Sequence, residues 1–222
     1  MGMITRNAAN NITTGGVILP AGINDTSVAS ISELEQVATG GGLNLISSQT
    51  ASGSASIEFT TGLDSTYDVY KFELINCHAS TDNSKLLFNG STDGGSNYNV
   101  TKTSTAFLAS HDEADTSTQL AYSVGFDLAQ ETGDQRLGTK FGIDNDQSMC
   151  ATMYLFSPSS TTYVKHFIAT SQNYTNEDSS HNYFVAGYMN TTSSINAIKF
   201  VMDSGNIDAG TIRMYGIQSS WA

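Results

Sequence analysis

From Leu43 to the C-terminus, the chain consists of short runs in which apolar and polar residues alternate. Tyr70, Phe72 and Leu74 share one face of such a run, and Phe200 belongs to another run of the same kind. Clusters of Gly, Asp, Asn and Ser separate the runs, as in residues 91–97. This alternation has the period of half-buried β-strands and predicts about ten of them.

The predicted strands follow one another without a convincing helix between them. This arrangement is typical of an all-β protein with an antiparallel β-sandwich, and we expect a jelly roll within that class. Residues 110–148 lack a regular alternation, so we expect an irregular stretch there. That stretch carries the most acidic motifs of the chain.

Residues 1–42 differ from the rest because they contain no aromatic residue, so they are not expected to form a core of their own. Within them, apolar residues spaced by three predict a short helix that begins at Asp25 or Ser27 and stops at a run of glycines. We therefore expect an N-terminal attachment arm over 1–42 and a β-sandwich domain over 43–222. The arm residues expected to bind a partner are Val17, Ile18, Leu19, Val28, Ile31 and Leu34.

Composition narrows the classes of partner. Charged residues make up 14% of the chain, and 21 acidic against 9 basic side chains give a formal charge of −12. Such a surface repels phosphate groups and no Lys/Arg cluster interrupts it, so we expect neither nucleic acid nor a membrane as partner. Cys77 and Cys150 are too few for a disulfide framework. Two buried thiols are the simpler interpretation, with a single bridge as the alternative.

The stretch ASHDEADTST, residues 109–118, concentrates one histidine and three carboxylates. One interpretation is a solvated loop. The alternative is a cation site, which would need further ligands from elsewhere because adjacent side chains rarely converge on one ion. Asp112 and Glu113 are the candidate ligands within this stretch.

A second acidic group, Asp144 and Asp146, lies in the sequence GIDNDQS. An Asp-Asn-Asp sequence forms a turn without any ion, but its oxygens are also the ligands that calcium prefers. Asp127 and Asp134 lie in the same region and are further candidates for either group. A weak calcium site is the alternative to two plain loops, and no other cofactor is expected.

Catalysis has little support in the sequence. The Gly-x-Ser-x-Gly pattern of a nucleophile elbow is absent, and none of the four histidines has an obvious sequence partner. We therefore do not expect an enzyme, although one sequence cannot place the two opposed carboxylates of a glycosidase. Several aromatic residues either stack on sugars or fill the sandwich, and we favour packing. They are Tyr163, Tyr174, Tyr183, Tyr188 and Trp221.

Three segments carry a resemblance to a known group of proteins. They are LISSQTASGSASIEFTTGLDSTYDVYKFELINCHASTDN (45–83), NGSTDGGSNYNVT (89–101) and YFVAGYMNTTSSINAIKFVMDSGNIDAGTIRMYGI (183–217). These segments resemble virion structural proteins of marine tailed bacteriophages, which are described as tail-fibre-like or simply structural. The resemblance covers about residues 43 to 218 and lies in segments that are expected to form strands and turns. It carries over no active-site residue, and the arm has no counterpart in it.

The resemblance implies a protein of the virion, assembled in the cytoplasm of a bacterial host. We expect a fibre- or knob-like appendage that is attached through the arm to other virion proteins and displays its sandwich to the host surface, where a glycan is the candidate ligand. A homo-oligomer is expected, with a trimer favoured. The alternatives are a capsid decoration protein that stabilises the head lattice and, as a third class, a carbohydrate-active enzyme.

Overall fold

The computed structural model describes residues 12–13, 16–17 and 42–217, and the chain divides into two units, Met1–Thr39 and Gly40–Ala222. In the first unit, β1 (Ile12–Thr13) and β2 (Gly16–Val17) pair as a two-stranded antiparallel sheet. Of the arm residues predicted to bind a partner, Val17 belongs to β2. The others, and the predicted helix, lie outside the described residues: Ile18, Leu19, Val28, Ile31 and Leu34.

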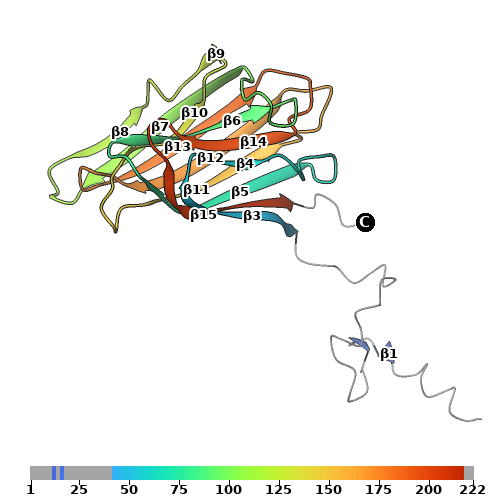
Figure 1. Cartoon of the computed structure of the whole chain (residues 1–222), viewed down its shortest axis with the longest axis horizontal. Helices are drawn as coiled ribbons and strands as arrows, with labels where there is room; N and C mark the ends of the chain where they lie inside the picture. The colour runs from blue at the N-terminus through green and yellow to red at the C-terminus, as the bar shows by residue number, and fades with distance from the viewer. Residues whose placement is uncertain (1–11, 14–15, 18–41, 218–222) are drawn as a thin grey trace, which may run out of the picture. The chain divides into compact units, whose positions relative to one another are not determined.

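The second unit is all-β and consists of two antiparallel sheets (Figure 1). The larger sheet has nine strands, in the order β3 (Leu43–Ser54), β15 (Ile207–Ile217), β5 (Val69–Ala79), β11 (Met149–Phe156), β12 (Lys165–Tyr174), β13 (Ser179–Met189), β7 (Lys102–Asp112) and β8 (Thr118–Tyr122), with β9 (Ala129–Glu131) also paired to β7. The smaller sheet has four strands, in the order β10 (Gln135–Phe141), β6 (Ser84–Ser91), β14 (Ala197–Met202) and β4 (Ser56–Phe59).

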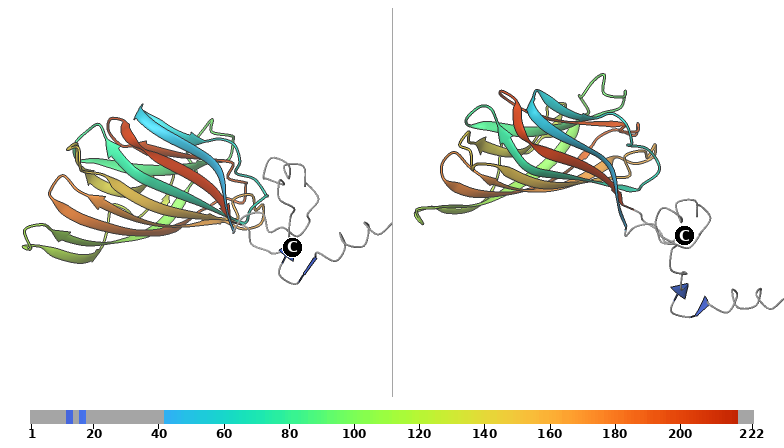
Figure 2. Two further views of the ribbon diagram at one scale, coloured as in Figure 1. Left: turned by 90° about the horizontal axis from the view of Figure 1, so that it is seen from below. Right: turned by 60° about the horizontal axis from the view of Figure 1, so that its bottom comes forward.

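The two sheets form the layers of a β-sandwich, which Figure 2 shows from two further sides. The part of the chain that the structure describes contains no helix suited to crossing a membrane. The all-β, antiparallel fold class predicted from the alternation is therefore confirmed.

The alternation of the sequence sets which side chains face the core. Tyr70, Phe72 and Leu74 of β5 are all buried, while the residues between them are partly exposed. Phe200 and Met202 of β14 follow the same rule. Since successive side chains of a strand point to opposite faces, one face of each sheet supplies the core.

Aromatic rings join the two sheets. The ring centroids of Phe72, in β5, and Phe200, in β14, lie 5.5 Å apart, and Phe59 of β4 approaches Phe72 edge-on at 5.6 Å. Phe88 of β6 meets Phe167 of β12 edge-on at 5.1 Å. Each large ring removes a wide apolar surface from water, and edge-on contacts are favourable for aromatic pairs. The sandwich core is centred on these contacts.

β10, at the edge of the smaller sheet, packs mainly against β12, so the larger sheet extends past it through β13, β7 and β8. On its inner side the loop between β8 and β9 covers this extension, because Phe126 stacks on Tyr183 with a centroid distance of 4.4 Å. The guanidinium carbon of Arg136 lies 5.9 Å from the centre of the Phe126 ring. Loop packing therefore continues the core beyond the smaller sheet.

The prediction that residues 110–148 are irregular was wrong in part, because β8, β9 and β10 lie within them. In β8 four of the five residues are exposed, and all three residues of β9 are exposed. Such strands bury no face and so need no apolar alternation. In β10 two register shifts against β6 disturb the pattern that would have revealed a strand.

One glycine is required by close contact at a bulge. Gly210 has a φ of +121° at an irregularity in the pairing of β15 with β5. A Cβ at this position would lie 2.8 Å from the Cα of Cys77. Both the backbone conformation and the space exclude a larger residue.

Truncating the ring that contacts both sheets tests this account of the core. We expect Phe200→Ala to lower the free energy of unfolding by about 3 to 5 kcal/mol, because it removes a fully buried ring and leaves a cavity. Tyr163→Ala is the matched control, since Tyr163 is 73% exposed, and it should change stability by less than about 0.5 kcal/mol. Denaturant unfolding at equilibrium measures both. Equal losses in the two variants would contradict this view of the core.

Candidate functional site

The acidic stretch 109–118 forms the end of β7, a turn and the start of β8. The carboxylate of Asp112 closes this turn: its Oδ1 accepts hydrogen bonds from the amides of Thr116, at 2.9 Å, and Ser117, at 2.8 Å, and its Oδ2 accepts one from the Thr116 hydroxyl. These hydrogen bonds, that of the Thr116 side chain first, lower the pKa of Asp112. His111 Nε2 lies 3.1 Å from Asp115 Oδ1. Asp112 thus has a structural partner for both oxygens.

The two predicted acidic groups lie at the same end of the sandwich. The Glu113 amide donates to the Asp178 carbonyl, at 2.9 Å, and the Tyr174 amide donates to the Ser148 carbonyl, at 3.1 Å. Desolvation, with the negative charges of Glu113, Asp178 and Asp146, raises the pKa of Tyr174 to about 12. The structure therefore brings Glu113 and Asp146 near one phenol.

Proximity alone does not make a metal centre at this end. Within residues 42–217, no group of three or more His, Cys, Asp or Glu side chains is arranged to hold a metal ion. Asp144 contributes its backbone carbonyl, which lies 3.2 Å from His78 Nε2. Asp127 and Asp134 belong to other contacts: Asp127 accepts from the Tyr122 hydroxyl, at 3.0 Å, and Asp134 from the Asn89 amide, at 2.8 Å. The candidate calcium ligands are thus spread over several local networks.

The two cysteines are free thiols. Cys77 is buried, and desolvation raises its pKa to about 12, so it remains protonated. Cys150 is exposed on the sheet, where its Sγ lies 3.3 Å from the Asn76 amide nitrogen. The expectation that both thiols are buried was wrong for Cys150, because that side chain is on the face of β11 opposite the core.

A polar cavity of about 460 Å³ lies beside β7 and β13. His181 is buried there, with Nδ1 3.1 Å from the Tyr183 hydroxyl, and desolvation together with the charge of Lys140 lowers its pKa. Lys140 itself forms an ion pair with Glu177 at the cavity. A neutral imidazole, hydroxyls and paired carboxylates suit hydrogen bonding to a neutral polar ligand.

The face of the larger sheet that points away from the smaller sheet, the outer face, carries exposed apolar side chains. Phe107 and Phe184 are stacked with a centroid distance of 4.6 Å, and Tyr122 pairs across the strands with Phe107. Ile168 and Leu120 extend the group and are 50% and 77% exposed. We call these five residues the apolar patch. They belong to β7, β8, β12 and β13.

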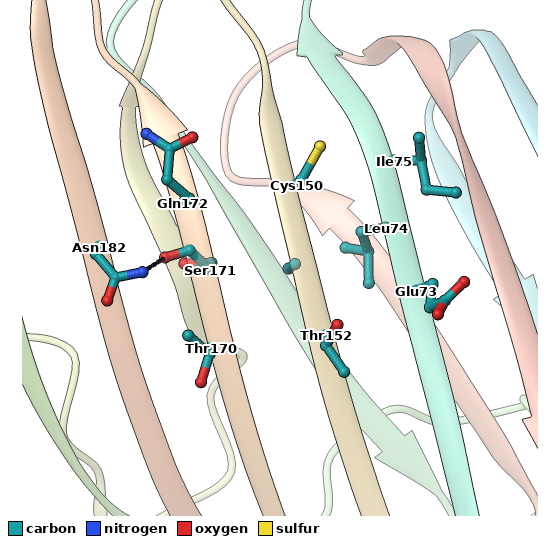
Figure 3. Close-up of a pocket in the computed structure, with 10 residues that line it drawn as sticks. Glu73, Leu74, Ile75, Cys150, Thr152, Thr170, Ser171, Gln172 and Asn182 are labelled. Carbon is teal, nitrogen blue, oxygen red and sulfur yellow. Dashed lines mark hydrogen bonds between the residues drawn. The ribbon is translucent and has the colours of Figure 1, made fainter.

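A shallow hollow of about 340 Å³ lies next to the apolar patch (Figure 3). The hollow is lined by residues of β5, β11 and β12 and by Asn182 of β13. Thr170 lines it and pairs across the strands with Phe184 of the patch. Figure 3 shows Gln172 and Asn182 on one side and Glu73 on the other, with the Asn182 amide donating to the Ser171 carbonyl at 2.9 Å. Its short side chains, such as Thr152, leave the sheet surface open. An open, shallow surface is suited to contact with a macromolecule rather than to enclosing a small ligand.

The aromatic residues singled out from the sequence do not form one surface. Tyr183 is buried, as the packing interpretation predicted, and Tyr163 is exposed in the loop before β12. Tyr188 lies partly exposed on β13, with its ring centre 6.3 Å from that of His166. Trp221 lies outside the described residues. Sequence reasoning missed Phe107 and Phe184, whose exposure follows from the sheet order and has no signal in the local alternation.

The turn closed by Asp112 gives a pH prediction. The pKa of Asp112 is lower in the folded protein than in the unfolded chain, so its hydrogen bonds stabilise the fold at pH values above the ordinary carboxyl range. This stabilisation is lost as the pH falls through the folded-state pKa of Asp112. In an NMR titration we expect the amide resonances of Thr116 and Ser117 to shift together at a pH below 3.8, the ordinary pKa of an aspartate carboxyl. Asp112→Asn should abolish this shared step, and its persistence in that variant would contradict the assignment.

Comparisons with known proteins identify no relative. No protein-family model matches the chain, and no curated protein or solved structure matches it either.

Proposed function

We propose that the chain is a structural protein of a tailed-bacteriophage virion, a fibre- or knob-like appendage attached through its N-terminal arm. Support comes from the three sequence segments that resemble such proteins. These segments lie in β3 to β6 and in β13 to β15. A sandwich with few charged side chains suits a rigid, protease-resistant component of a particle. Partner binding by the arm, through Val17 and the apolar residues that follow it, belongs to the same proposal.

We also infer that the sandwich is a jelly roll with two insertions. Eight strands support this: the first pairs with the last (β3 with β15), the second with the seventh (β4 with β14), the third with the sixth (β5 with β11) and the fourth with the fifth (β6 with β10). This nesting is the pattern of a hairpin folded into two Greek keys. The strands β7 to β9 and β12 to β13 are then insertions that widen one sheet.

The apolar patch is the observation that carries the proposal. All five of its residues lie on the strands assigned to the insertions. Soluble monomers rarely leave a large contiguous apolar surface in water, and such surfaces mark interaction sites. We propose that the patch packs against copies of the same chain in a homo-oligomer, with a trimer as the expected order. The insertions therefore add a contact surface to a simpler sandwich.

The polar cavity beside His181 is the proposed contact for a host surface glycan. Its hydroxyl and imidazole groups match the hydrogen-bonding needs of sugar hydroxyls. Both of its carboxylates already have partners: Asp112 closes its own turn and Glu177 is paired with Lys140. A glycosidase needs one carboxyl free to protonate and one free to attack or activate water, so these contacts favour binding over hydrolysis.

Locating the chain in intact particles tests the proposed position. We expect cryo-electron microscopy to show it in a few copies on the tail or at a vertex. Many copies distributed over the capsid lattice would contradict the appendage and support a decoration protein instead.

Substitution within the apolar patch tests its role in assembly. We expect Phe107→Ser combined with Phe184→Ser to convert the oligomer to monomer in sedimentation velocity, because both stacked rings leave the contact. Their side chains are on the outer face, so circular dichroism should show the sandwich intact. Tyr163→Ser, which changes an exposed aromatic residue outside the patch, is the control and should leave the oligomer unchanged. A wild-type monomer would refute the proposal.

A further inference from the structure

Two lysines are completely buried in the sandwich, and they have different surroundings. Lys165 Nζ donates to the backbone carbonyls of Tyr163 and Thr191, both at 3.1 Å. Lys102 Nζ donates to the Val100 carbonyl, at 2.7 Å, and to the side-chain oxygen of Asn89, at 2.6 Å. A buried lysine is costly unless it is paired, so each requires an explanation. Only in the case of Lys102 is the partner a side-chain amide.

The carboxamide of Asn89 is also completely buried, and its own contacts fix its orientation. Its nitrogen donates to the carboxylate of Asp134, at 2.8 Å, and to the Thr132 carbonyl, at 3.1 Å. Its oxygen accepts a hydrogen bond from the amide of Gly90, at 2.9 Å, in addition to that from Lys102. The amide nitrogen therefore faces a carboxylate while its oxygen faces two donors.

These groups match the requirements of an acyl transfer. Lys102 supplies an amine nucleophile, Asn89 supplies the carbonyl, the Gly90 amide is placed to stabilise negative charge on the carbonyl oxygen, and Asp134 is placed to carry a proton to the nitrogen that departs. We propose that Lys102 and Asn89 join in an intramolecular isopeptide bond, with Asp134 as the acid–base group. The proposal is independent of the virion role.

The reaction balances without any co-reactant. Lys102 first loses its ammonium proton to water, and its neutral Nζ moves from the Asn89 oxygen onto the carbonyl carbon, Cγ, and forms the new C–N bond. The attacking nitrogen gives up one proton, which Asp134 passes to Nδ2. The Cγ–Nδ2 bond then breaks and ammonia leaves, taking the lysine's first proton as ammonium. An ammonium and a carboxamide thereby become a secondary amide and an ammonium ion.

Burial prepares Lys102 for this step. Desolvation lowers the pKa of Lys102 to about 8, with the positive charge of Lys199 acting in the same direction and the carboxylate of Asp134 opposing it. A larger share of the amine is therefore neutral near pH 7 than for an exposed lysine. A neutral amine held against a fixed carbonyl needs no further encounter, which removes much of the entropic barrier.

The bond would connect the two layers of the sandwich. Asn89 belongs to β6 of the smaller sheet, and Lys102 begins β7 of the larger sheet. The link would also close the loop of residues 89–102 into a ring. Closing a loop covalently restricts the unfolded chain, as a disulfide does, but an amide is insensitive to reducing agents. A protein with two free thiols would thus have a permanent cross-link of another kind.

Mass spectrometry of the purified full chain tests the proposal directly. After denaturation and chymotrypsin cleavage following Tyr98, we expect the fragments that contain Asn89 and Lys102 to remain joined, with a total mass lower by one ammonia molecule. Trypsin should fail to cut after Lys102. It should cut after Lys165, the matched internal control, whose contacts are backbone carbonyls. Separate fragments of unaltered mass would overturn the proposal.

Two further outcomes identify the chemistry. Asn89 precedes Gly90, a pair that also loses ammonia by cyclising to a succinimide. In that case the chymotryptic fragments separate and trypsin cuts after Lys102, which would overturn the proposal despite the mass loss. Asp134→Asn should fold and yield predominantly unlinked protein, because no carboxylate is left to carry the proton. Linkage as complete as in the wild type would overturn the role of Asp134.

Discussion

Packing of aromatic rings between the two sheets is the interaction on which the rest of the structure depends. Phe72 and Phe200 meet from opposite layers at 5.5 Å, and Phe88 and Phe167 repeat the contact at 5.1 Å. Because these rings fill the inner faces, the outer face of the larger sheet is left to water. That division fixes where contact surfaces can lie. It also holds β6 and β7 close enough for Asn89 to meet a lysine from the other sheet.

The proposed insertions explain why the larger sheet has more than twice as many strands as the smaller one. The smaller sheet covers only part of its partner, and Phe126 covers part of the remainder by stacking on Tyr183. The added strands carry every residue of the apolar patch. A widened sheet with apolar side chains facing water is costly to a monomer and useful to an assembly. The geometry therefore relates one change in topology to one proposed change in function.

Polar groups inside the sandwich show two ways of accommodating a buried lysine. Lys165 donates to backbone carbonyls of the loops before β12 and after β13. Lys102 donates to the amide oxygen of Asn89, and that amide in turn contacts a carboxylate and a backbone donor, so that these groups together match a reaction. Neither arrangement can be recognised in the local sequence, because Lys102 and Lys165 both lie in segments with the ordinary composition of β-strands. What distinguishes them is which loops and strands lie over each lysine.

The sequence by itself determined the fold class and much of the core. The alternation around Phe72 and Phe200 has a period of two, and burying one face of each strand leaves few alternatives to stacked antiparallel sheets. Only the tertiary structure decided which strands are neighbours, because pairing joins segments far apart in the chain. It thereby placed Phe107 beside Phe184 and brought Asp134 to the amide of Asn89. Exposed strands such as β8 could not be predicted from the sequence, because they bury no face and so need no apolar alternation.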